Sequence, residues 1–427
     1  MTTAKGYTEM KDSRADWIGK IPATWDVSKI GTLYTQRNEK VSDKDYPPLS
    51  VTMKGILPQL ATAAKTDDGD NRKLVRVGDF AINSRSDRRG SCGISPYDGS
   101  VSLINTILVS RKKMHPGYYD WLFHTTLFAD EFYKWGHGIV DDLWTTRWQE
   151  MKRILVPVPP YETQSAIAAY LDTQCAKIDE IIAQAKAGIE DYKQWKASII
   201  YEAVTKGLDP NVEMKDSGVE WIGEVPMRWK IVRLKYLLST PLQYGANETG
   251  LPYDESLPRY IRITDITLDG KLKTSGMQSL SEEKSEGYIL DDEDILLARS
   301  GATVGKAFYY RESYGKAAFA GYLIRAKINS AKALPKFIYY STMSAGYEKW
   351  KETAVIQATI QNIGASRYNE YSLAIPPIAE QLRIIEFLDD KMEKIDSLMA
   401  EKQSLIDDLE SYKKSLIYEV VTGKRRV

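Results

Sequence analysis

The feature that most constrains this fold is a duplication of a short leader and a long proline-free segment. The leader Met10–Trp25 recurs as Met214–Trp229, with nine of sixteen positions identical. The segment Pro157–Lys206 recurs as Ala374–Gly423 without a gap, with 19 of 50 positions identical. A block that differs between the two copies lies between each leader and its long segment. A repeat of this size predicts two similar units within one chain.

Each long segment is predicted to form one helix with an apolar seven-residue repeat. No proline falls within residues 162–206 or 378–427. The a and d positions include Leu171, Ile178, Ile182 and Ile189 in the first segment, and Leu388, Ile395, Met399 and Ile406 in the second. A 3.5-residue apolar repeat held over about five heptads is typical of a coiled coil. We expect the two helices to pair with each other; the alternative is that each packs on its own domain.

Two of the a positions carry lysine, at Lys196 and Lys413. Lysine at such a position usually lowers the stability of a coiled coil. We expect the aliphatic stems to be buried and the ammonium groups to reach solvent or a carboxylate on the partner helix. The alternative is that both lysines lie near frayed helix ends.

The duplication predicts an α+β fold in four parts. Residues 1–156 and 208–374 are expected to form two variable domains, and residues 157–207 and 375–427 the two long helices. Within the variable domains, alternating apolar and polar residues predict short strands, and longer periodic stretches predict helices. The expected strands are Lys73–Val77, Val101–Val109, Tyr260–Thr264, Asp294–Ala298 and Tyr322–Ile328, and the expected helices are Tyr118–Tyr133 and Pro335–Trp350.

Basic residues gather in the first variable domain, although the whole chain has 58 Lys and Arg against 58 Asp and Glu. Residues 1–156 hold 23 basic and 19 acidic side chains, whereas both long segments are net acidic. The densest basic loop is Arg85-Ser-Asp-Arg-Arg-Gly90, and its counterpart is Arg299-Ser-Gly-Ala-Thr-Val-Gly-Lys306. Similar residues precede both loops, which predicts a shared strand leading to an arginine-bearing loop.

These two loops are candidates for DNA contact. Arginine can bond a guanine edge, lysine and arginine neutralise phosphates, and glycine lets the backbone approach a duplex. A solvated turn with ordinary surface charge is the alternative. The candidate DNA-contacting residues are Arg85, Ser86, Arg88, Arg89, Arg299, Ser300, Thr303 and Lys306.

Several motifs that resemble catalytic sites lack the residues that the chemistry needs. Gly301–Lys306 is one residue shorter than a phosphate-binding P-loop, and Ala307 stands where a hydroxyl would bind magnesium. Val158-Pro-Pro-Tyr161 lacks the polar first residue with which adenine methyltransferases hold a base. Three histidines and two cysteines do not have the spacing of a metal site. With no catalytic constellation, the sequence favours a binding protein.

No run of eighteen apolar residues occurs, and the polar start predicts neither a signal peptide nor a membrane anchor. We therefore expect a soluble, cytoplasmic protein that does not contact a membrane.

The chain resembles the specificity subunits of type I restriction–modification systems over essentially its whole length. The most specific motifs are the Trp-Ile-Gly-x-x-Pro-x-x-Trp leaders at Trp17–Trp25 and Trp221–Trp229, and the Pro-Pro…Gln…Leu-Asp helix starts at Pro159–Asp172 and Pro376–Asp389. Arg299–Lys306 and Thr359–Gly364 also resemble the family, whereas the first block departs from it at Arg85–Gly90 and Thr145–Arg147.

The resemblance implies a DNA-reading protein without catalytic residues, cofactor or metal of its own. Each variable domain would be a target-recognition domain for one half of a bipartite double-stranded DNA site. The helices would form an antiparallel coiled coil with pseudo-two-fold symmetry, set the spacer, and dock two adenine-methyltransferase subunits through the heptad positions named above. Up to two motor–nuclease subunits would join. S-adenosylmethionine, ATP and magnesium would bind to those partners.

Two other classes of function remain open from the sequence. One is an assembly scaffold or decoy that binds the methyltransferase without reading DNA. The other is an enzyme, such as a nuclease with unfamiliar residues.

Overall fold

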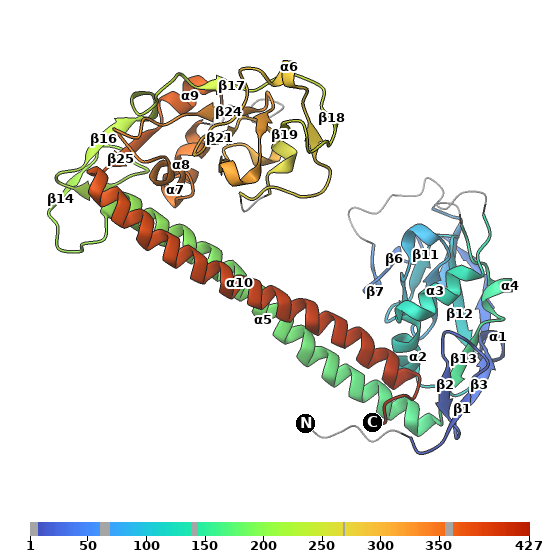
Figure 1. Ribbon diagram of the computed structural model, residues 1–427. Helices are drawn as coiled ribbons and strands as arrows, with labels where there is room; N and C mark the ends of the chain where they lie inside the picture. The colour runs from blue at the N-terminus through green and yellow to red at the C-terminus, as the bar shows by residue number, and fades with distance from the viewer. Residues whose placement is uncertain (1–6, 60–68, 139–143, 268–269, 355–361) are drawn as a thin grey trace. The chain divides into compact units, whose positions relative to one another are not determined.

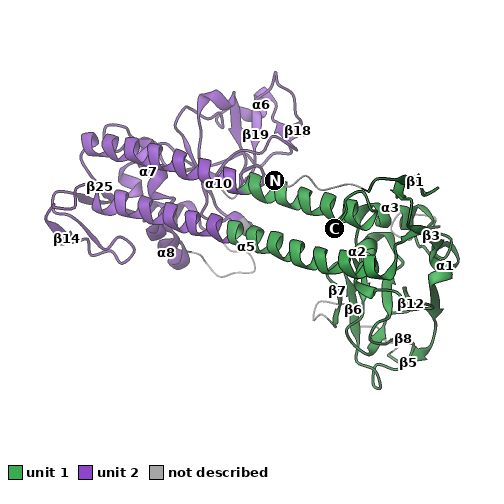
Figure 2. Cartoon of the chain, turned by 90° about the horizontal axis from the view of Figure 1, so that it is seen from below, with its two compact units in different colours: residues 1–186, 403–427 green, residues 187–402 purple. Residues whose placement is uncertain are grey.

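The computed structural model describes residues 7–59, 69–138, 144–267, 270–354 and 362–427. The chain forms two compact units: unit 1 holds residues 1–186 and 403–427, and unit 2 holds residues 187–402 (Figure 2). Two long helices, α5 (Tyr161–Lys206) and α10 (Ile378–Val421), each contribute one part to unit 1 and the other part to unit 2. Each unit therefore contains one leader, one variable block and a portion of both long helices.

Short, mainly antiparallel strands and several short helices form the variable block of unit 1 (Figure 1). Its four-stranded sheet has the order β10 (Cys92–Ile94), β9 (Phe80–Asn83), β12 (Asn105–Ser110) and β4 (Tyr34–Arg37). A three-stranded sheet has the order β11 (Gly99–Val101), β8 (Arg72–Val75) and β5 (Lys40–Val41), and β6 (Leu49–Thr52) pairs with β7 (Gly55–Pro58). Phe80 on β9 packs against Phe123 of helix α2 (Pro116–Phe123), with ring centroids 4.6 Å apart.

The variable block of unit 2 contains two four-stranded sheets. One has the order β17 (Gln243–Tyr244), β24 (Leu323–Ala326), β21 (Ile295–Ala298) and β22 (Ala307–Tyr309). The other has the order β18 (Leu251–Pro252), β20 (Gln278–Ser279), β19 (Arg259–Ile261) and β23 (Ala317–Phe319), and its β19–β23 pair is parallel. Helices α7 (Pro335–Ser341) and α8 (Ala345–Ala354) contribute Phe337, Tyr347 and Trp350 to the core of this unit.

The sequence predicted one helix in each block where the structure has two. Residues 118–133 belong to α2 and to α3 (Thr126–Lys134), because the Thr125 hydroxyl caps α3 by accepting a hydrogen bond from the Phe128 amide at 3.2 Å. Residues 335–350 are divided in the same way between α7 and α8, where the Ser344 hydroxyl accepts from the Tyr347 amide at 3.2 Å. A capping hydroxyl bonds a backbone amide that has no partner within the helix, and so favours the start of a new helix at that residue. The predicted strand Val101–Val109 is likewise interrupted, between β11 and β12.

The two leaders fold into the same hairpin. In unit 1, β1 (Met10–Asp12) pairs with β2 (Lys20–Pro22), and Met10 lies opposite Pro22. In unit 2, β14 (Met214–Asp216) pairs with β15 (Glu224–Pro226), and Met214 lies opposite Pro226. Trp25 and Trp229, which close the two leaders, are both almost fully buried. The identities between the leaders thus correspond to one repeated local structure.

A tryptophan in each leader holds the strand that precedes the long helix. Trp17 donates from its indole nitrogen to the Leu155 carbonyl at 3.2 Å, at the start of β13 (Leu155–Val158). Trp221 donates to the Ser372 carbonyl at 3.3 Å, at the start of β25 (Ser372–Ile375). Strand β13 pairs with β3 (Asp26–Lys29), and β25 pairs with β16 (Lys230–Arg233). The proline pairs after these strands therefore lie at strand-to-helix junctions.

The glutamine of each helix start joins the long helix to the variable block. Gln164 accepts from the His115 amide at 2.9 Å and donates to the Pro159 carbonyl at 2.8 Å. Gln381 accepts from the Leu334 amide at 2.7 Å and donates to the Pro376 carbonyl at 2.9 Å. His115 and Leu334 are the N-cap residues of α2 and α7. Each glutamine thus satisfies two backbone groups of two different elements.

Two contacts in each unit show that the long helices run antiparallel there, because Lys186 of α5 also pairs with Glu410 in unit 1 and Lys402 of α10 also lies over the Tyr192 ring in unit 2. In unit 1, Lys413 of α10 bonds Asp179 of α5 at 2.6 Å. In unit 2, Lys196 of α5 bonds Asp396 of α10 at 2.6 Å. The Lys196 and Lys413 side chains are about three-quarters or more buried, at 20% and 25% exposed. The expectation of a buried stem with its ammonium group on a carboxylate is therefore confirmed for both lysines.

Most of the predicted heptad positions lie between these helices or against the variable blocks. Leu171, Ile178, Ile182, Leu388, Ile395 and Ile406 are buried, and Ile189 and Met399 are partly buried. Such burial of apolar side chains is the main favourable contribution to helix pairing. The fold is thus a mixed α/β structure with two long helices.

Candidate nucleic-acid interface

The two candidate loops are hairpin connections at equivalent places in the two units. The first joins β9 to β10, and the second joins β21 to β22. The Asn83 amide donates to the Ser91 carbonyl at 2.9 Å, and the Ala298 amide donates to the Lys306 carbonyl at 2.8 Å. Each loop contains one short 3₁₀ helix, η1 (Ser86–Arg88) or η5 (Gly301–Thr303). A P-loop leads from a strand into an α-helix, so the strand β22 after the second loop argues against a nucleotide site there.

The backbone shifts the expected match between the two loops by one residue. Their Arg-Ser sequences suggested that Arg85 and Arg299 are equivalent. However, the Ser84 carbonyl accepts from the Thr146 amide at 3.0 Å, and the Arg299 carbonyl accepts from the Ile363 amide at 2.8 Å. The equivalent of Arg299 is therefore Ser84, and Arg85 corresponds to Ser300. Since successive residues of an extended chain point to opposite faces, Arg85 and Arg299 do not serve the same face of their units.

The arginines of the first loop are all exposed, and two of them are close to carboxylates. Arg88 lies 3.6 Å from Asp87, and Arg89 forms an ion pair with Asp130 of α3. Surface pairs of this kind contribute little to stability and rearrange easily. Arg85 is exposed beside Thr145, with which it forms a β-bridge, and Ser86 is partly buried. The first loop can therefore present its guanidinium groups to a ligand.

Arg299 in the second loop lies over an aromatic ring. Its guanidinium carbon is 4.8 Å from the centroid of the Tyr244 ring, a distance typical of a cation–π contact. The Tyr244 hydroxyl accepts a hydrogen bond from the Ala365 amide at 3.0 Å, at the start of α9 (Ala365–Asn369). The Arg299 Nε is buried without a hydrogen-bond partner. Tyr244 thus fixes the direction in which this arginine leaves the loop.

The other three residues of the second loop differ in accessibility. Ser300 is 9% exposed and forms a β-bridge with Asn362, so its side chain does not face a ligand in this structure. Thr303 and Lys306 are partly buried. The motif Thr359–Gly364 lies partly outside the described residues, since the structure describes it from Asn362 onwards.

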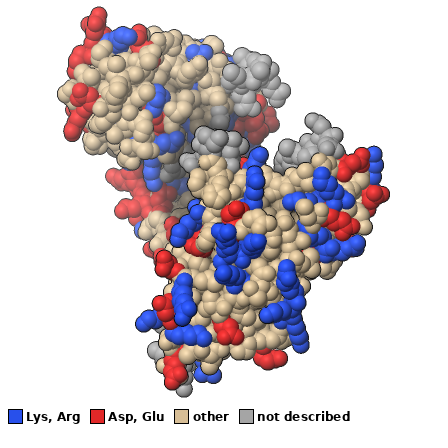
Figure 3. All heavy atoms as spheres, turned by 90° about the vertical axis from the view of Figure 1, so that its right-hand side faces the viewer, with Lys and Arg blue, Asp and Glu red and all other residues tan. Residues whose placement is uncertain are grey.

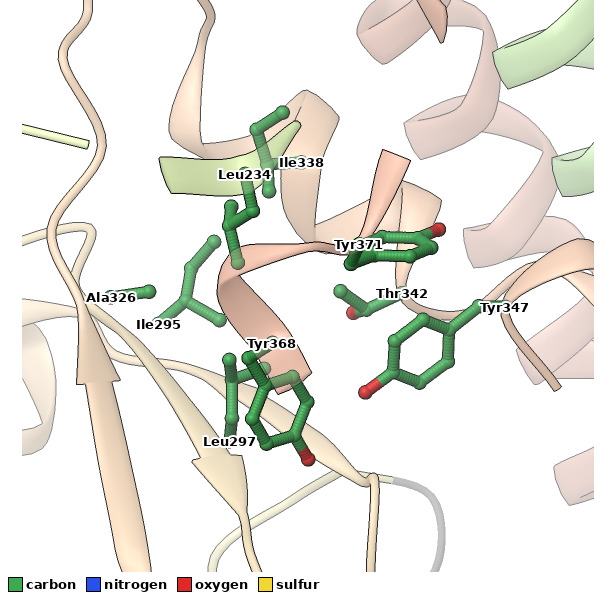
Figure 4. A pocket seen from close by; sticks show the side chains of 9 residues that line it. All are labelled: Leu234, Ile295, Leu297, Ala326, Ile338, Thr342, Tyr347, Tyr368 and Tyr371. Carbon is green, nitrogen blue, oxygen red and sulfur yellow. The ribbon is translucent and has the colours of Figure 1, made fainter. Parts of the chain in front are cut away.

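Two buried tyrosines hold the second loop at both ends. Tyr368 of α9 donates to the Ala298 carbonyl at 2.9 Å, just before the loop, and Tyr347 of α8 donates to the Gly305 carbonyl at 2.6 Å, near its end. Both rings lie around a small apolar cavity of about 10 Å³ (Figure 4). Burial raises the pKa of both phenols, so each keeps the proton that it donates. In unit 1, Tyr133 of α3 donates to the Asn83 carbonyl at 3.4 Å.

An open hollow of about 340 Å³ lies beside the first loop in unit 1. Its lining includes Ser84, Gln36 of β4, and Arg147, Trp148 and Gln149 around the start of α4 (Trp148–Met151). Arg147 ends the segment Thr145–Arg147, where the first block departs from the family motif, and nothing in the sequence indicates that it lies near Gln36. These residues are far apart in the sequence, and no local pattern connects them.

Lysine and arginine side chains are spread over the face of unit 1 that Figure 3 presents, with fewer acidic side chains among them. A surface with this charge attracts a polyanion such as DNA.

No group of three or more histidine, cysteine or acidic side chains that could hold a metal occurs among the described residues. His115 caps α2, and His124 lies 3.7 Å from Asp120 on the preceding turn. The cysteines Cys92 and Cys175 are unpaired and buried, and burial raises the pKa of both thiols. In the described part of the chain, no helix is both long and apolar enough to cross a membrane.

Six large apolar side chains on the described long helices remain exposed, and four of them form two pairs, whereas Leu382 and Leu405 of α10 stand outside these pairs. In unit 1, Ile181 and Tyr412 are 44% and 47% exposed. In unit 2, Leu398 and Trp195 are 39% and 51% exposed. The Lys413–Asp179 and Lys196–Asp396 bonds set an antiparallel register that places the two members of each pair at the same level. Trp195 and Tyr412 are equivalent positions in the sequence repeat, as are Ile181 and Leu398.

Comparison with known proteins finds one matching domain model and relatives that match either most of the chain or less than half of it. Residues 259–407 match the type I restriction modification DNA specificity domain. The type I restriction enzyme MjaVIII specificity subunit of Methanocaldococcus jannaschii is 24% identical over 397 residues, covering 89% of this chain and 88% of the relative. The EcoKI specificity subunit of Escherichia coli is 29% identical over 191 residues, covering 42% of this chain and 39% of the relative.

Solved structures share the fold. A chain from a study of complex assembly and conformational transition of the type I R-M system superposes with a TM-score of 0.71 at 13% identity, covering 94% of this chain and 98% of that chain. The HsdS subunit of Thermoanaerobacter tengcongensis superposes with a TM-score of 0.51 at 15% identity, with the same coverage. By its domain match and its sequence relatives, the chain is similar to type I restriction enzyme specificity subunits, and it shares the fold of these solved structures.

Proposed function

We propose that this chain is the non-catalytic subunit that reads the DNA target of a type I restriction–modification complex. Each variable domain would read one half of an asymmetric bipartite site. The observation that carries this proposal is a pair of hairpin loops at equivalent backbone positions, Arg85–Gly90 and Arg299–Lys306, with different side chains. A repeated scaffold with unlike loops suits a target whose two halves differ.

The loops offer the contacts that DNA recognition needs. Arginine can bond the O6 and N7 atoms of guanine in the major groove, and arginine and lysine contact phosphates. Arg85, Arg88 and Arg89 would serve the first half-site, and Arg299 and Lys306 the second. Ser86 and Thr303 lie on the 3₁₀ helices of the loops and could donate to phosphates. The burial of Ser300 argues against a direct contact from its side chain.

We further propose that the long helices form an antiparallel coiled coil with pseudo-two-fold symmetry, set the spacer, and dock two adenine-methyltransferase subunits. The buried heptad residues such as Ile182 and Leu388 support the helix pair itself, because their side chains are used within the units. Docking would then fall to the exposed pairs Ile181–Tyr412 and Leu398–Trp195. Exposed apolar groups of this kind are typical of interaction surfaces. Their equivalence in the repeat supports two copies of one partner.

Catalysis would reside in the partner subunits. Methyl transfer with S-adenosylmethionine would belong to the methyltransferases, and translocation and cleavage with ATP and magnesium to as many as two motor–nuclease subunits. The specificity-subunit family carries no cofactor of its own. A scaffold or decoy that reads no DNA is disfavoured because both loops are complete hairpins that carry exposed or ring-stacked arginines.

The proposal is tested by assembling the chain with its methyltransferase and selecting duplexes from a random DNA library. The bound sequences are expected to share one bipartite motif with two unlike halves and a fixed spacer. The methyltransferase alone, passed over the same library, is the control. Binding to the assembled complex without sequence enrichment would support the scaffold and contradict DNA reading.

A further inference from the structure

The largest difference in side chain between the first and second loops is at the position that Arg299 occupies in unit 2. The equivalent residue in unit 1 is Ser84, whose small side chain leaves the neighbouring space open as the hollow of about 340 Å³. In unit 2, the guanidinium of Arg299 leaves the same backbone position and lies over Tyr244. The two units therefore offer different surfaces at one equivalent place.

Unit 1 carries an arginine beside this place, but it comes from another segment. Arg147 is the N-cap residue of α4, and the equivalent N-cap residue of α9 in unit 2 is Gly364. Two positions further along, Gln149 in unit 1 corresponds to Ser366 in unit 2. Both Arg147 and Gln149 are exposed and line the hollow. Unit 1 thus has a guanidinium and an amide where unit 2 has neither.

The chemistry of the hollow suits a base edge. Among the described residues that line it, Lys73 and Arg147 are cationic and none is acidic. Lys73 is partly buried and donates to the Asn105 carbonyl at 2.7 Å, which leaves Arg147 as the exposed cation of the lining. Arginine pairs with guanine and glutamine with adenine through two hydrogen bonds each in the major groove. Gln36 adds a second amide to the lining.

We propose that the hollow at Arg147 and Gln149 reads one or two base pairs of the first half-site, in duplex DNA. This inference rests on the proposed function and deepens it, because it assigns direct readers outside the Arg85–Gly90 loop. The first domain would then read DNA with residues around the start of α4, and the loop arginines Arg88 and Arg89 would mainly contact phosphates. The second domain would read with Arg299 instead.

The test assembles the chain with its methyltransferase and selects duplexes from a random DNA library. The variants Arg147→Ala and Gln149→Ala are compared with the unsubstituted chain. Each substitution is expected to reduce preference at one or two positions of one half of the motif by about 5- to 150-fold, and to leave the other half unchanged. Arg153→Ala is the control, because Arg153 is exposed in the same unit but does not line the hollow. It is expected to change no base preference.

Three outcomes separate the proposals. If the unsubstituted complex enriches no motif, the proposed function itself fails. If it enriches a bipartite motif that Arg147→Ala and Gln149→Ala leave unaltered, DNA reading stands and the hollow is not a reader. Equal weakening on every sequence, with a shallower salt dependence, would make Arg147 a phosphate contact and would also overturn the inference. Co-purification of each variant with the methyltransferase verifies that the variant is folded.

Discussion

The substitution Gln164→Leu should loosen the junction between α5 and α2 in unit 1. Gln164 is 3% exposed and satisfies the His115 amide and the Pro159 carbonyl. Leucine has a similar size but no polar atoms, so both backbone groups would lose their partner. A buried group without a partner costs about 1–3 kcal/mol, and two would cost about 2–6 kcal/mol in local stability. Even 2 kcal/mol corresponds to roughly 30-fold faster exchange of the His115 amide.

Hydrogen–deuterium exchange read by mass spectrometry measures this effect directly. Gln164→Leu is expected to speed exchange in peptides that contain His115, and Gln381→Leu in peptides that contain Leu334, each without effect on the other unit. Gln184→Leu is the matched control, since Gln184 is exposed on the same helix and bonds only Glu180, at 3.3 Å. Unchanged exchange at His115 in Gln164→Leu would refute the reasoning that this glutamine holds the junction.

Three further predictions address the helices, the second loop and the buried phenols. Ile182→Asp buries an unpaired carboxylate, so it should lower the free energy of unfolding by about 3–5 kcal/mol and release the methyltransferase. Ala183→Asp, at an exposed position, should do neither. Denaturation measures the first effect and co-purification with the methyltransferase the second. Arg299→Ala should reduce preference at one base by about 1–3 kcal/mol in competition binding, and Arg311→Ala, an exposed arginine paired with Asp292, should not. No loss in Arg299→Ala would make the loop a solvated turn. Burial raises the pKa of Tyr347 and Tyr368. Their contribution to stability is therefore complete below pH 10 and lost as pH rises above it. The measurement is a titration to high pH that follows phenolate absorbance and the helical circular-dichroism signal together. Phenolate absorbance from these tyrosines that appears before the helical signal falls would contradict the prediction.

The scaffold could be predicted from the sequence because its signals are local or repeated. The identities in the leaders correspond to matching hairpins, and the absence of proline in residues 162–206 corresponds to one continuous helix, α5. The heptad pattern found most of the buried helix positions, including Leu171 and Leu388. These features depend on residues close together in the chain, or on a pattern that occurs twice.

The arrangement of the variable domains could not be predicted in the same way. Many strands have two to four residues, so their alternation is too brief to fix pairing partners or register. The one-residue shift between Arg85 and Arg299 is set by hydrogen bonds to Thr146 and Ile363, more than 60 residues further along the chain in each case. The hollow beside Ser84 joins side chains from five separate segments, so no local pattern in the sequence predicts it.

The most direct test of the central claim is genome-wide mapping of N6-methyladenine in cells that express this chain with its methyltransferase. Cells that lack only this chain are the control. We predict one bipartite motif, with a fixed spacer and two unlike halves, that disappears from the control. Methylation that stays unchanged in the control, while the two proteins still associate, would contradict the claim that this chain selects the DNA target.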